Sequence, residues 1–400
     1  MAQSVVRTLD HGQFQRSTVG QKTQMKIVVA MDSFKGSLSA GSACEIVAES
    51  IRSAVPDAQI IVKPMADGGE GTAQAMIAAG DGQWIEQTTM GPLPDMRAGA
   101  GFAWFADERT AVVEMATASG LELLEPGLRN PLKTTTFGTG QLMAAAIDHG
   151  AKRILLAVGG SATVDGGVGA AMAMGWKFLD ENGRDISLGG GQLAAMEQII
   201  PPSQPIRVSV EVLCDVDNPL FGERGAARVY GPQKGATKEM VELLEAGLAH
   251  LAELVKKKLG RDIKDIPGAG AAGGLAAGAV AFMNGQLVSG IETVMSQSRL
   301  YEALAQADWV ITGEGRFDRQ SLRGKVVSGV ARAVRRGGHG TKVAVLAGQV
   351  LLEPHEYRSL GVVEALACAD GQMDLQYAIK NSEELLAQAA RTFALRHVVA

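Results

Sequence analysis

Five apolar segments of this 400-residue chain each end in a turn that contains a carboxylate, and four of these turns are rich in glycine. Each segment has the short aliphatic character of a strand that is buried on both faces. The segments are Ile27–Met31, Ile60–Val62, Ile154–Val158, Val208–Leu213 and Asp308–Ile311. In an open α/β sheet the turns that follow parallel strands share one edge, where ligands bind. The pattern therefore predicts a parallel sheet with a polar site along that edge.

Helices are expected between these strands. Ser39 stands where an N-cap is needed for a helix over 40–54, and Thr237 stands in the same relation to a long amphipathic helix. Further helices are expected over 139–149, 167–174 and 383–395, and further strands over 111–115, 342–347 and 362–367. Strands that alternate with helices indicate an α/β fold with a mostly parallel sheet.

The chain is longer than the roughly 250–300 residues at which single hydrophobic cores stop growing. We expect a discontinuous, Rossmann-like parallel-sheet domain of residues 25–87 and 286–400. A second α/β domain of residues 88–285 is expected to be inserted into it. The polar residues 1–24 are expected to be a disordered extension, or to precede the true start of translation.

Charge and cysteine content exclude several classes of protein. The formal net charge is −5 and no long run of Lys or Arg occurs, so we expect no nucleic-acid partner. The three cysteines have no C-x-x-C spacing, which fits a reducing compartment and offers no structural zinc site. No stretch of about 18 apolar residues occurs, so we expect no membrane span. These features predict a cytoplasmic protein, for which a homodimer is a candidate assembly.

The turn from Gly159 to Gly167 gives the strongest local signal, because it reads GGSATVDGG between a strand and a helix. Glycine lets backbone N–H groups approach an anion, and a helix N-terminus favours negative charge. We therefore expect Gly159, Gly160, Ser161 and Thr163 to contact a phosphate. Asp165 could hold Mg²⁺ or fix the loop. A tight connection without a ligand is the alternative.

The other turns supply the remaining groups that phosphoryl transfer from a nucleotide requires. This reaction needs anion donors, a carboxylate for Mg²⁺, cations beside the moving phosphate and a base. The six histidines lie outside the five turns, so we expect the base to be a carboxylate. Lys35, Lys325 and Lys234 are candidate cations, although a single lysine can also be a solvated surface residue. A Walker A sequence is absent, and the G-x-G-x-x-G at 268–273 follows no strand.

Seven motifs occur in order along the chain: DSFKGSLS from Asp32, PMADGGEGT from Pro64, GGSATVDGG from Gly159, CDVDNP from Cys214, PQKG from Pro232, GAAGG from Gly270 and ITGEGRFD from Ile311. Together they closely resemble the bacterial glycerate kinase type-1 family, the glycerate 2-kinases, from Met25 to the C-terminal region. The resemblance implies ATP-dependent phosphorylation of D-glycerate, with 2-phosphoglycerate as the expected product. It also implies two α/β domains with the active site in the cleft between them. ATP and Mg²⁺ are the expected cofactors. A 3-phosphoglycerate product, another small hydroxy acid as acceptor, and a non-catalytic sugar-acid sensor remain alternatives.

We assign roles within these motifs as hypotheses. Asp67 or Asp217 would orient or deprotonate the attacking hydroxyl, and Arg316 or Lys35 would hold the glycerate carboxylate. The candidates by role are Asp67, Asp217 and Lys35 for catalysis; Asp32, Ser33, Glu70, Arg316 and Asp318 for substrate binding; Gly159, Gly160, Ser161, Thr163 and Lys325 for the nucleotide; and Asp165, Asp215 and Glu314 for the metal.

Overall fold

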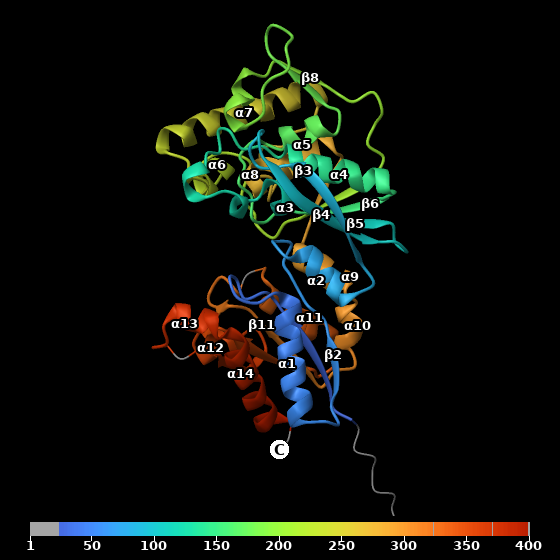
Figure 1. Cartoon of the computed structure of the whole chain (residues 1–400), viewed down its shortest axis with the longest axis vertical. Helices are drawn as coiled ribbons and strands as arrows, with labels where there is room; N and C mark the ends of the chain where they lie inside the picture. Colours follow the sequence, from blue (N-terminus) through green and yellow to red (C-terminus); the bar gives the residue numbers. More distant parts are fainter. Residues whose placement is uncertain (1–23, 323, 370, 399–400) are drawn as a thin grey trace, which may run out of the picture.

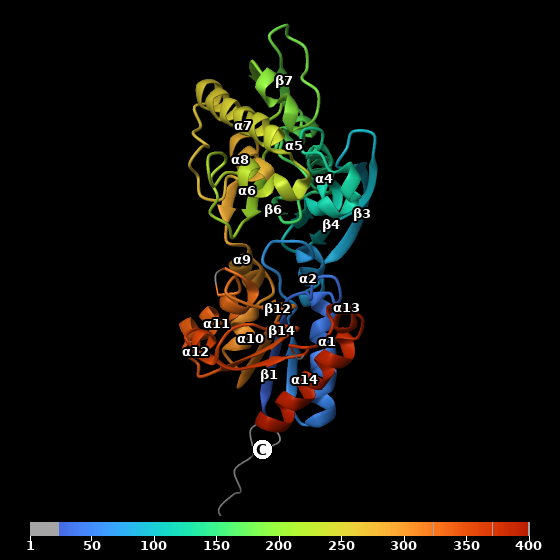
Figure 2. The same cartoon turned by 90° about the vertical axis from the view of Figure 1, so that its left-hand side faces the viewer.

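The chain forms two lobes, each built around one large β-sheet (Figures 1 and 2). The computed structural model describes residues 24–322, 324–369 and 371–398, so the extension expected over 1–24 lies outside the described residues except for Gln24. The lower lobe in Figure 1 contains both the blue beginning and the red end of the described chain, and the upper lobe contains its middle. No helix among the described residues is long and apolar enough to cross a lipid bilayer.

The first lobe contains a five-stranded, fully parallel sheet. Its strand order is β15-β13-β11-β1-β2, with β1 at Lys26–Met31, β2 at Gln59–Val62, β11 at Trp309–Gly313, β13 at Lys342–Ala347 and β15 at Val362–Ala367. One face is covered by α1 (Ala40–Ala54) and α14 (Ser382–His397), and the other by α10 (Leu300–Leu304) and α11 (Val326–Gly337). The strands are buried because helices cover both faces, which explains their nearly unbroken apolar sequences.

The second lobe contains a six-stranded mixed sheet of order β10-β9-β6-β5-β4-β3. Its strands are β3 at Gln83–Met90, β4 at Arg97–Phe105, β5 at Thr110–Glu114, β6 at Arg153–Ala157, β9 at Ser209–Leu213 and β10 at Gln286–Val288. The strands from β10 to β5 are parallel, whereas β4 and β3 form an antiparallel edge. The outer face packs against α4 (Phe137–His149), α5 (Val168–Ala173), α6 (Ala226–Tyr230), α7 (Lys238–Leu259) and α8 (Ala271–Phe282).

Helices α2 (Thr72–Ala79) and α9 (Gly290–Gln297) lie between the two sheets (Figure 1). One apolar cluster passes through them, from Val28 in the first sheet to Leu155 in the second. Burial of apolar surface is the main favourable term in folding and association. The lobes therefore share a continuous apolar core at their junction, in addition to the two crossings of the chain.

The chain crosses between the lobes just before β3 and just after β10, because both of these strands pair within the second sheet. The expected boundary at 88 thus falls inside β3, and the one at 286 falls at the first residue of β10. The division into domains of residues 25–87 with 286–400 and of residues 88–285 stays a prediction. The strand pairing favours limits of 83 and 288 for the inserted part.

The fold class was predicted correctly, and the local helix signals explain why. The Ser39 side chain accepts a hydrogen bond from Ser42 N at the start of α1, and Thr237 does the same for Met240 N at the start of α7. Gly71, in a left-handed conformation, occupies the N-cap position of α2. The smaller elements are α3 (Ala116–Ser119), α12 (Pro354–Arg358), α13 (Leu375–Lys380), β7 (Lys177–Leu179), β8 (Gln198–Ile200), β12 (Arg316–Phe317), β14 (Gln349–Val350) and the 3₁₀ turns Leu121–Leu123, Pro126–Leu128, Gly190–Ala195 and Pro232–Lys234.

Candidate active site

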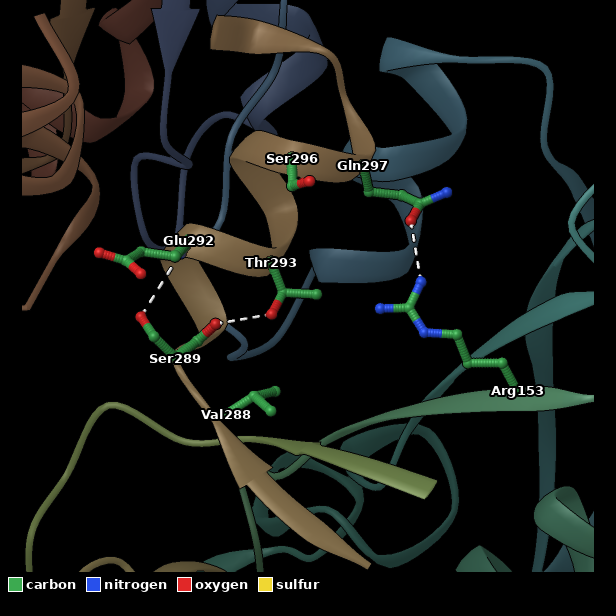
Figure 3. Close-up of a pocket in the computed structure, with 7 residues that line it drawn as sticks. All are labelled: Arg153, Val288, Ser289, Glu292, Thr293, Ser296 and Gln297. Atoms are coloured by element: carbon green, nitrogen blue, oxygen red, sulfur yellow. Dashed lines mark hydrogen bonds between the residues drawn. The ribbon is translucent and has the colours of Figure 1, made fainter. Parts of the chain in front are cut away.

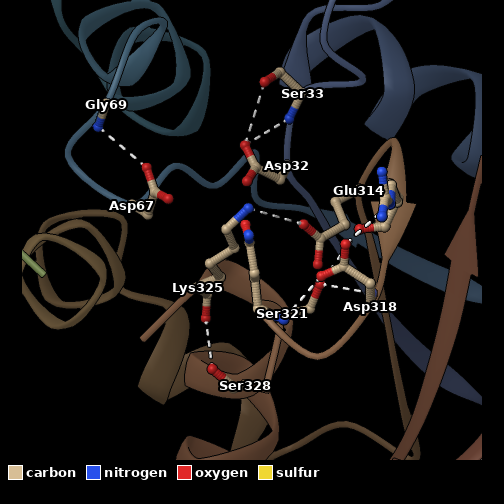
Figure 4. A network of polar contacts seen from close by, with 11 residues as sticks. Asp32, Ser33, Asp67, Gly69, Glu314, Asp318, Ser321, Lys325 and Ser328 are labelled. Carbon is tan, nitrogen blue, oxygen red and sulfur yellow. Dashed lines mark hydrogen bonds and ion pairs between the residues drawn. The ribbon is translucent and has the colours of Figure 1, made fainter. Parts of the chain in front are cut away.

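Three carboxylates meet at the ends of neighbouring strands of the first sheet (Figure 4). Asp32 follows β1, Asp67 lies in the turn beyond β2, and Glu314 follows β11. These strands are adjacent and parallel, so their carboxyl ends share one edge. Lys325, at the N-cap position of α11, reaches into the same group, with its Nζ 3.8 Å from a Glu314 oxygen. The structure thus brings together three of the acids and one of the lysines that the sequence singled out.

The electrostatics of this group depend on burial and on repulsion between the acids. Burial raises the pKa of Asp32 to about 8, and the charges of Asp67 and Glu314 add to the shift. The backbone N–H of Ser33, which donates to an Asp32 oxygen at 2.7 Å, and the charge of Lys325 oppose it. Burial also raises the pKa of Glu314. A carboxyl group whose pKa is near neutrality is suited to accept a proton during catalysis.

The same carboxylates are chemically suited to Mg²⁺, although they do not form a complete cage for it. Glu314 is only 5% exposed, and within the described parts of the chain its Oε1 atom is buried without a hydrogen-bond partner. No three His, Cys, Asp or Glu side chains of the described residues are grouped closely enough to hold a metal alone. Mg²⁺ at nucleotide sites usually takes one or two carboxylates, with phosphate oxygens and water completing its shell. A pair of acids from this group fits that requirement.

The turns of the second sheet reach the same place through close backbone contacts. A Cβ atom on Gly159 would lie 2.5 Å from Gly69 Cα, and one on Gly68 would lie 2.8 Å from Leu213 Cβ. Real Cβ atoms do not approach so closely, so these positions require glycine. Gly160 adopts a left-handed backbone with φ of 73°, and a Cβ there would face a Glu70 oxygen at 3.9 Å. The loop that begins at Asp67 therefore packs directly onto the glycine turn after β6.

Asp165 lies beneath this glycine turn and is almost completely buried. Its Oδ2 atom accepts from Thr136 N at 2.7 Å and Gly169 N at 3.3 Å, and its Oδ1 atom accepts from Gly167 N at 3.1 Å. Burial raises the pKa of Asp165, and these donors oppose the shift. Because the donors occupy the lone pairs that a cation would need, the geometry favours the loop-fixing role over the metal-binding one.

Ser161 and Thr163, the other polar residues of the turn, differ in exposure. Thr163 is fully buried, which leaves its side chain no surface for direct contact with a nucleotide. Ser161 is 8% exposed, and its Oγ atom accepts a hydrogen bond from Lys234 Nζ at 2.6 Å. Lys234 is itself buried, contrary to the expectation of a cation that touches phosphate.

Two further carboxylates of the second sheet cap the helices between the lobes. Asp215, just beyond β9, accepts from Ser289 Oγ at 2.8 Å and from the backbone N–H groups of Gly290 and Ile291, at the start of α9. These bonds favour a capping role for Asp215 over the expected metal-binding role. Glu114, at the end of β5, binds the start of α2 in the same way, through Gly71 N and Ala73 N.

Glu114 was missed in the sequence analysis, although one signal could have identified it. It is a lone carboxylate at the end of an otherwise apolar strand, at the same strand-end position as the acids that were chosen. No glycine-rich turn follows Glu114, unlike most of the other strand-end acids. Glu114 therefore did not fit the pattern from which the candidates were selected.

The remaining candidates lie on the surface around the group. Asp217 has a side chain 78% exposed and forms an ion pair with Arg224 at 2.9 Å, an arrangement that does not favour a catalytic base. Arg316 is 64% exposed and pairs with Asp318 at 2.9 Å, so each neutralises the other. Lys35 is exposed, as is Glu70, and Ser33 is half-buried beside Asp32.

A cavity of about 290 Å³ lies against α9, and Asp32, Asp67 and Glu314 are not among its lining residues (Figure 3). Its polar lining comes from Arg153 on β6 and from one side of α9. Arg153 is already engaged by Glu211 through two bonds of 2.7 Å and by Gln297 at 3.3 Å. The cavity is therefore a polar space at the lobe junction. The positive charge of Arg153, which lines it, is already neutralised by Glu211. The lining residues are Arg153, Val288, Ser289, Glu292, Thr293, Ser296 and Gln297.

Comparison with known proteins gives a consistent result. The model of the glycerate kinase family matches residues 27–397. The "Glycerate kinase" of Halalkalibacterium halodurans is 43% identical over 374 residues, which are 92% of this chain and 97% of that protein. The "Glycerate 2-kinase" of Escherichia coli K12 is 42% identical over 373 residues with the same coverage. A crystal structure from Salmonella typhimurium LT2, assigned as glycerate kinase 2, superimposes with a TM-score of 0.83 at 41% identity and covers 94% of this chain and 98% of its own.

Proposed function

Because the chain belongs to the glycerate kinase family, we propose that it transfers the terminal phosphoryl group of ATP to the 2-hydroxyl of D-glycerate, giving 2-phosphoglycerate and ADP. The observation that carries the proposal is the group formed by Asp32, Asp67, Glu314 and Lys325 at the edge of the first sheet. Support for the 2-hydroxyl comes from the name of the Escherichia coli relative.

In this proposal Asp32 accepts the proton of the attacking hydroxyl. Because its pKa is raised to about 8, its ionised form is a stronger base than an ordinary aspartate, and that form prevails only above this pH. This differs from the expectation from sequence, in which Asp67 or Asp217 was the base and Asp32 bound the substrate. Asp217 lies on the surface in an ion pair with Arg224, and Asp67 is better placed beside the metal. The proton would leave the glycerate oxygen as that oxygen bonds to phosphorus, and the bond to the ADP oxygen would break on the opposite side.

Glu314 and Asp67 would hold Mg²⁺, which when bound neutralises charge on the phosphates. Lys325 would place a positive charge beside the transferred phosphoryl group, since its Nζ already lies next to Glu314. The Gly159–Ser161 turn would donate hydrogen bonds to the nucleotide phosphates from the second sheet. The proposed substrates thus lie between the strand ends of the two sheets, where water can be excluded.

The test is an assay of ADP release with D-glycerate, L-glycerate and glycerol as separate acceptors, followed by NMR of the product. We expect release with D-glycerate alone and a phosphorus–proton coupling to the C2 hydrogen. Coupling to the C3 hydrogens would replace the proposed product with 3-phosphoglycerate. Nucleotide or glycerate binding without turnover would overturn the proposal in favour of a sensor.

A further inference from the structure

Lys234 is a buried lysine directly beneath the glycine turn after β6. It lies in the 3₁₀ turn Pro232–Lys234, and it is 2% exposed. Its Nζ atom donates to Ser161 Oγ at 2.6 Å and to the backbone oxygen of Thr163 at 2.8 Å. Both acceptors belong to the same turn, so a single side chain ties the polar part of this turn to a distant segment of the second lobe.

A lysine at such a position needs an explanation beyond packing. Removing an ammonium group from water is strongly unfavourable, and burial lowers the pKa of Lys234 to about 7, an effect that the charge of Asp165 opposes. An apolar side chain of similar length would fill the space without that cost. The geometry therefore indicates that the ammonium group itself is required where it contacts Ser161.

The contact fixes the direction of the Ser161 hydroxyl. While Lys234 is protonated, its ammonium group can only donate hydrogen bonds, so Ser161 Oγ must accept, and its own proton is left to point elsewhere. The backbone on either side of Ser161 is also held, because Leu121 N donates to Gly160 O at 2.8 Å and Ala162 N donates to Ser119 O at 3.0 Å. Ser161 is thus a hydrogen-bond donor prepared before any ligand arrives.

The hydroxyl lies at the edge of the proposed active site. Gly159 and Gly160, which immediately precede Ser161, are in contact with the loop of Gly69 and Glu70. That loop begins at Asp67, which interacts electrostatically with Asp32 and Glu314. Ser161, which is 8% exposed, therefore belongs to the turn that packs against the loop of these acids.

We propose that Lys234 is a positioning residue that holds the Ser161 hydroxyl as a donor to a phosphate oxygen of the bound nucleotide. This inference rests on the proposed function, because the ligand of Ser161 is the nucleotide of that reaction. Lys234 is too buried to touch the ligand itself, so it acts through Ser161.

The experiment is a double-mutant cycle of Lys234→Met and Ser161→Ala, measured by KM for ATP, KM for D-glycerate and the Kd for ADP from calorimetry. We expect each single variant to raise KM for ATP and the Kd for ADP by about tenfold, with KM for D-glycerate within about twofold of wild type. The double variant should show the same tenfold change, because both substitutions remove one interaction. Lys257→Met, at an exposed lysine of α7, is the matched control and should change neither constant.

A double variant with a roughly hundredfold change would show that the two residues act independently and would overturn the proposal. So would a folded Lys234→Met protein with unchanged KM for ATP. If Lys234→Met does not fold, Ser161→Ala decides alone. A Ser161→Ala protein with the melting temperature and the Kd for ADP of the wild type would overturn the proposal. A wild-type protein without glycerate-dependent ADP release would instead refute the proposed function, so the two failures are distinguishable.

Discussion

The Glu114 carboxylate accepts a 2.5 Å hydrogen bond from the backbone N–H of Ala73, and so links a strand of the second sheet to the helix that follows the Asp67 loop. A second bond, from Gly71 N at 3.1 Å, completes the cap. Both ends of this contact are shielded from water. The position of the Asp67 loop in the first lobe thus depends on a side chain of the second lobe.

Glu114→Ala is expected to lower the free energy of unfolding by about 2–4 kcal/mol, because it leaves the buried N–H of Ala73 and the part-buried N–H of Gly71 without acceptors. Urea denaturation measures this change. Glu122→Ala, at an exposed acid nearby, is the control and should stay within about 0.5 kcal/mol of wild type. A loss for Glu114→Ala no larger than that of the control would contradict the capping role.

Asp32→Asn is expected to stabilise the protein at alkaline pH. The pKa of Asp32 is raised from 3.8 to about 8, so the folded state holds a proton that the unfolded state loses, and wild-type stability falls as pH rises between these values. The neutral amide avoids this loss. We expect the variant to melt about 2–4 °C above wild type at pH 8.5, and the difference to shrink toward pH 4. If the variant and the wild type melted at the same temperature at both pH values, the raised pKa of Asp32 would be refuted.

Asp165→Asn is expected to destabilise the protein without changing its use of metal. The amide nitrogen cannot accept from the backbone N–H groups that now bind both Asp165 oxygens, so we expect a loss of about 2–4 kcal/mol in the free energy of unfolding. The Mg²⁺ concentration at half-maximal activity should not change. A stable variant that needs tenfold more Mg²⁺ would restore Asp165 to the metal site.

The sequence predicted the parallel sheet and most helices because each carries a local signal. Ser39 and Thr237 cap their helices through neighbouring residues, so three or four positions suffice to identify the helix start. The β3–β4 edge was not predicted, because strand pairing depends on residues far apart in the chain. The small and aromatic residues of this edge are also a weaker sequence signal for strands than the aliphatic runs elsewhere.

The candidate site was only partly predictable, for a related reason. A carboxylate in a glycine-rich turn can face a ligand or the backbone N–H groups of its own lobe, and sequence does not distinguish these cases. Asp32 and Asp165 occur in similar contexts, yet Asp32 faces other acids whereas Asp165 faces backbone donors. The burial of Lys234 likewise follows from tertiary packing of its turn beneath the turn after β6, far away in sequence.

The most direct test of the central claim compares kcat/KM for D-glycerate in Asp32→Asn and Asp217→Asn, with melting temperatures as the check on folding. We predict that kcat/KM falls about a hundredfold or more in Asp32→Asn, because a positioned base contributes on that order. In Asp217→Asn we predict a change in kcat/KM within about twofold. A folded Asp32→Asn enzyme with wild-type kcat/KM, or a large loss confined to Asp217→Asn, would contradict the assignment of phosphoryl transfer to the acids at the edge of the first sheet.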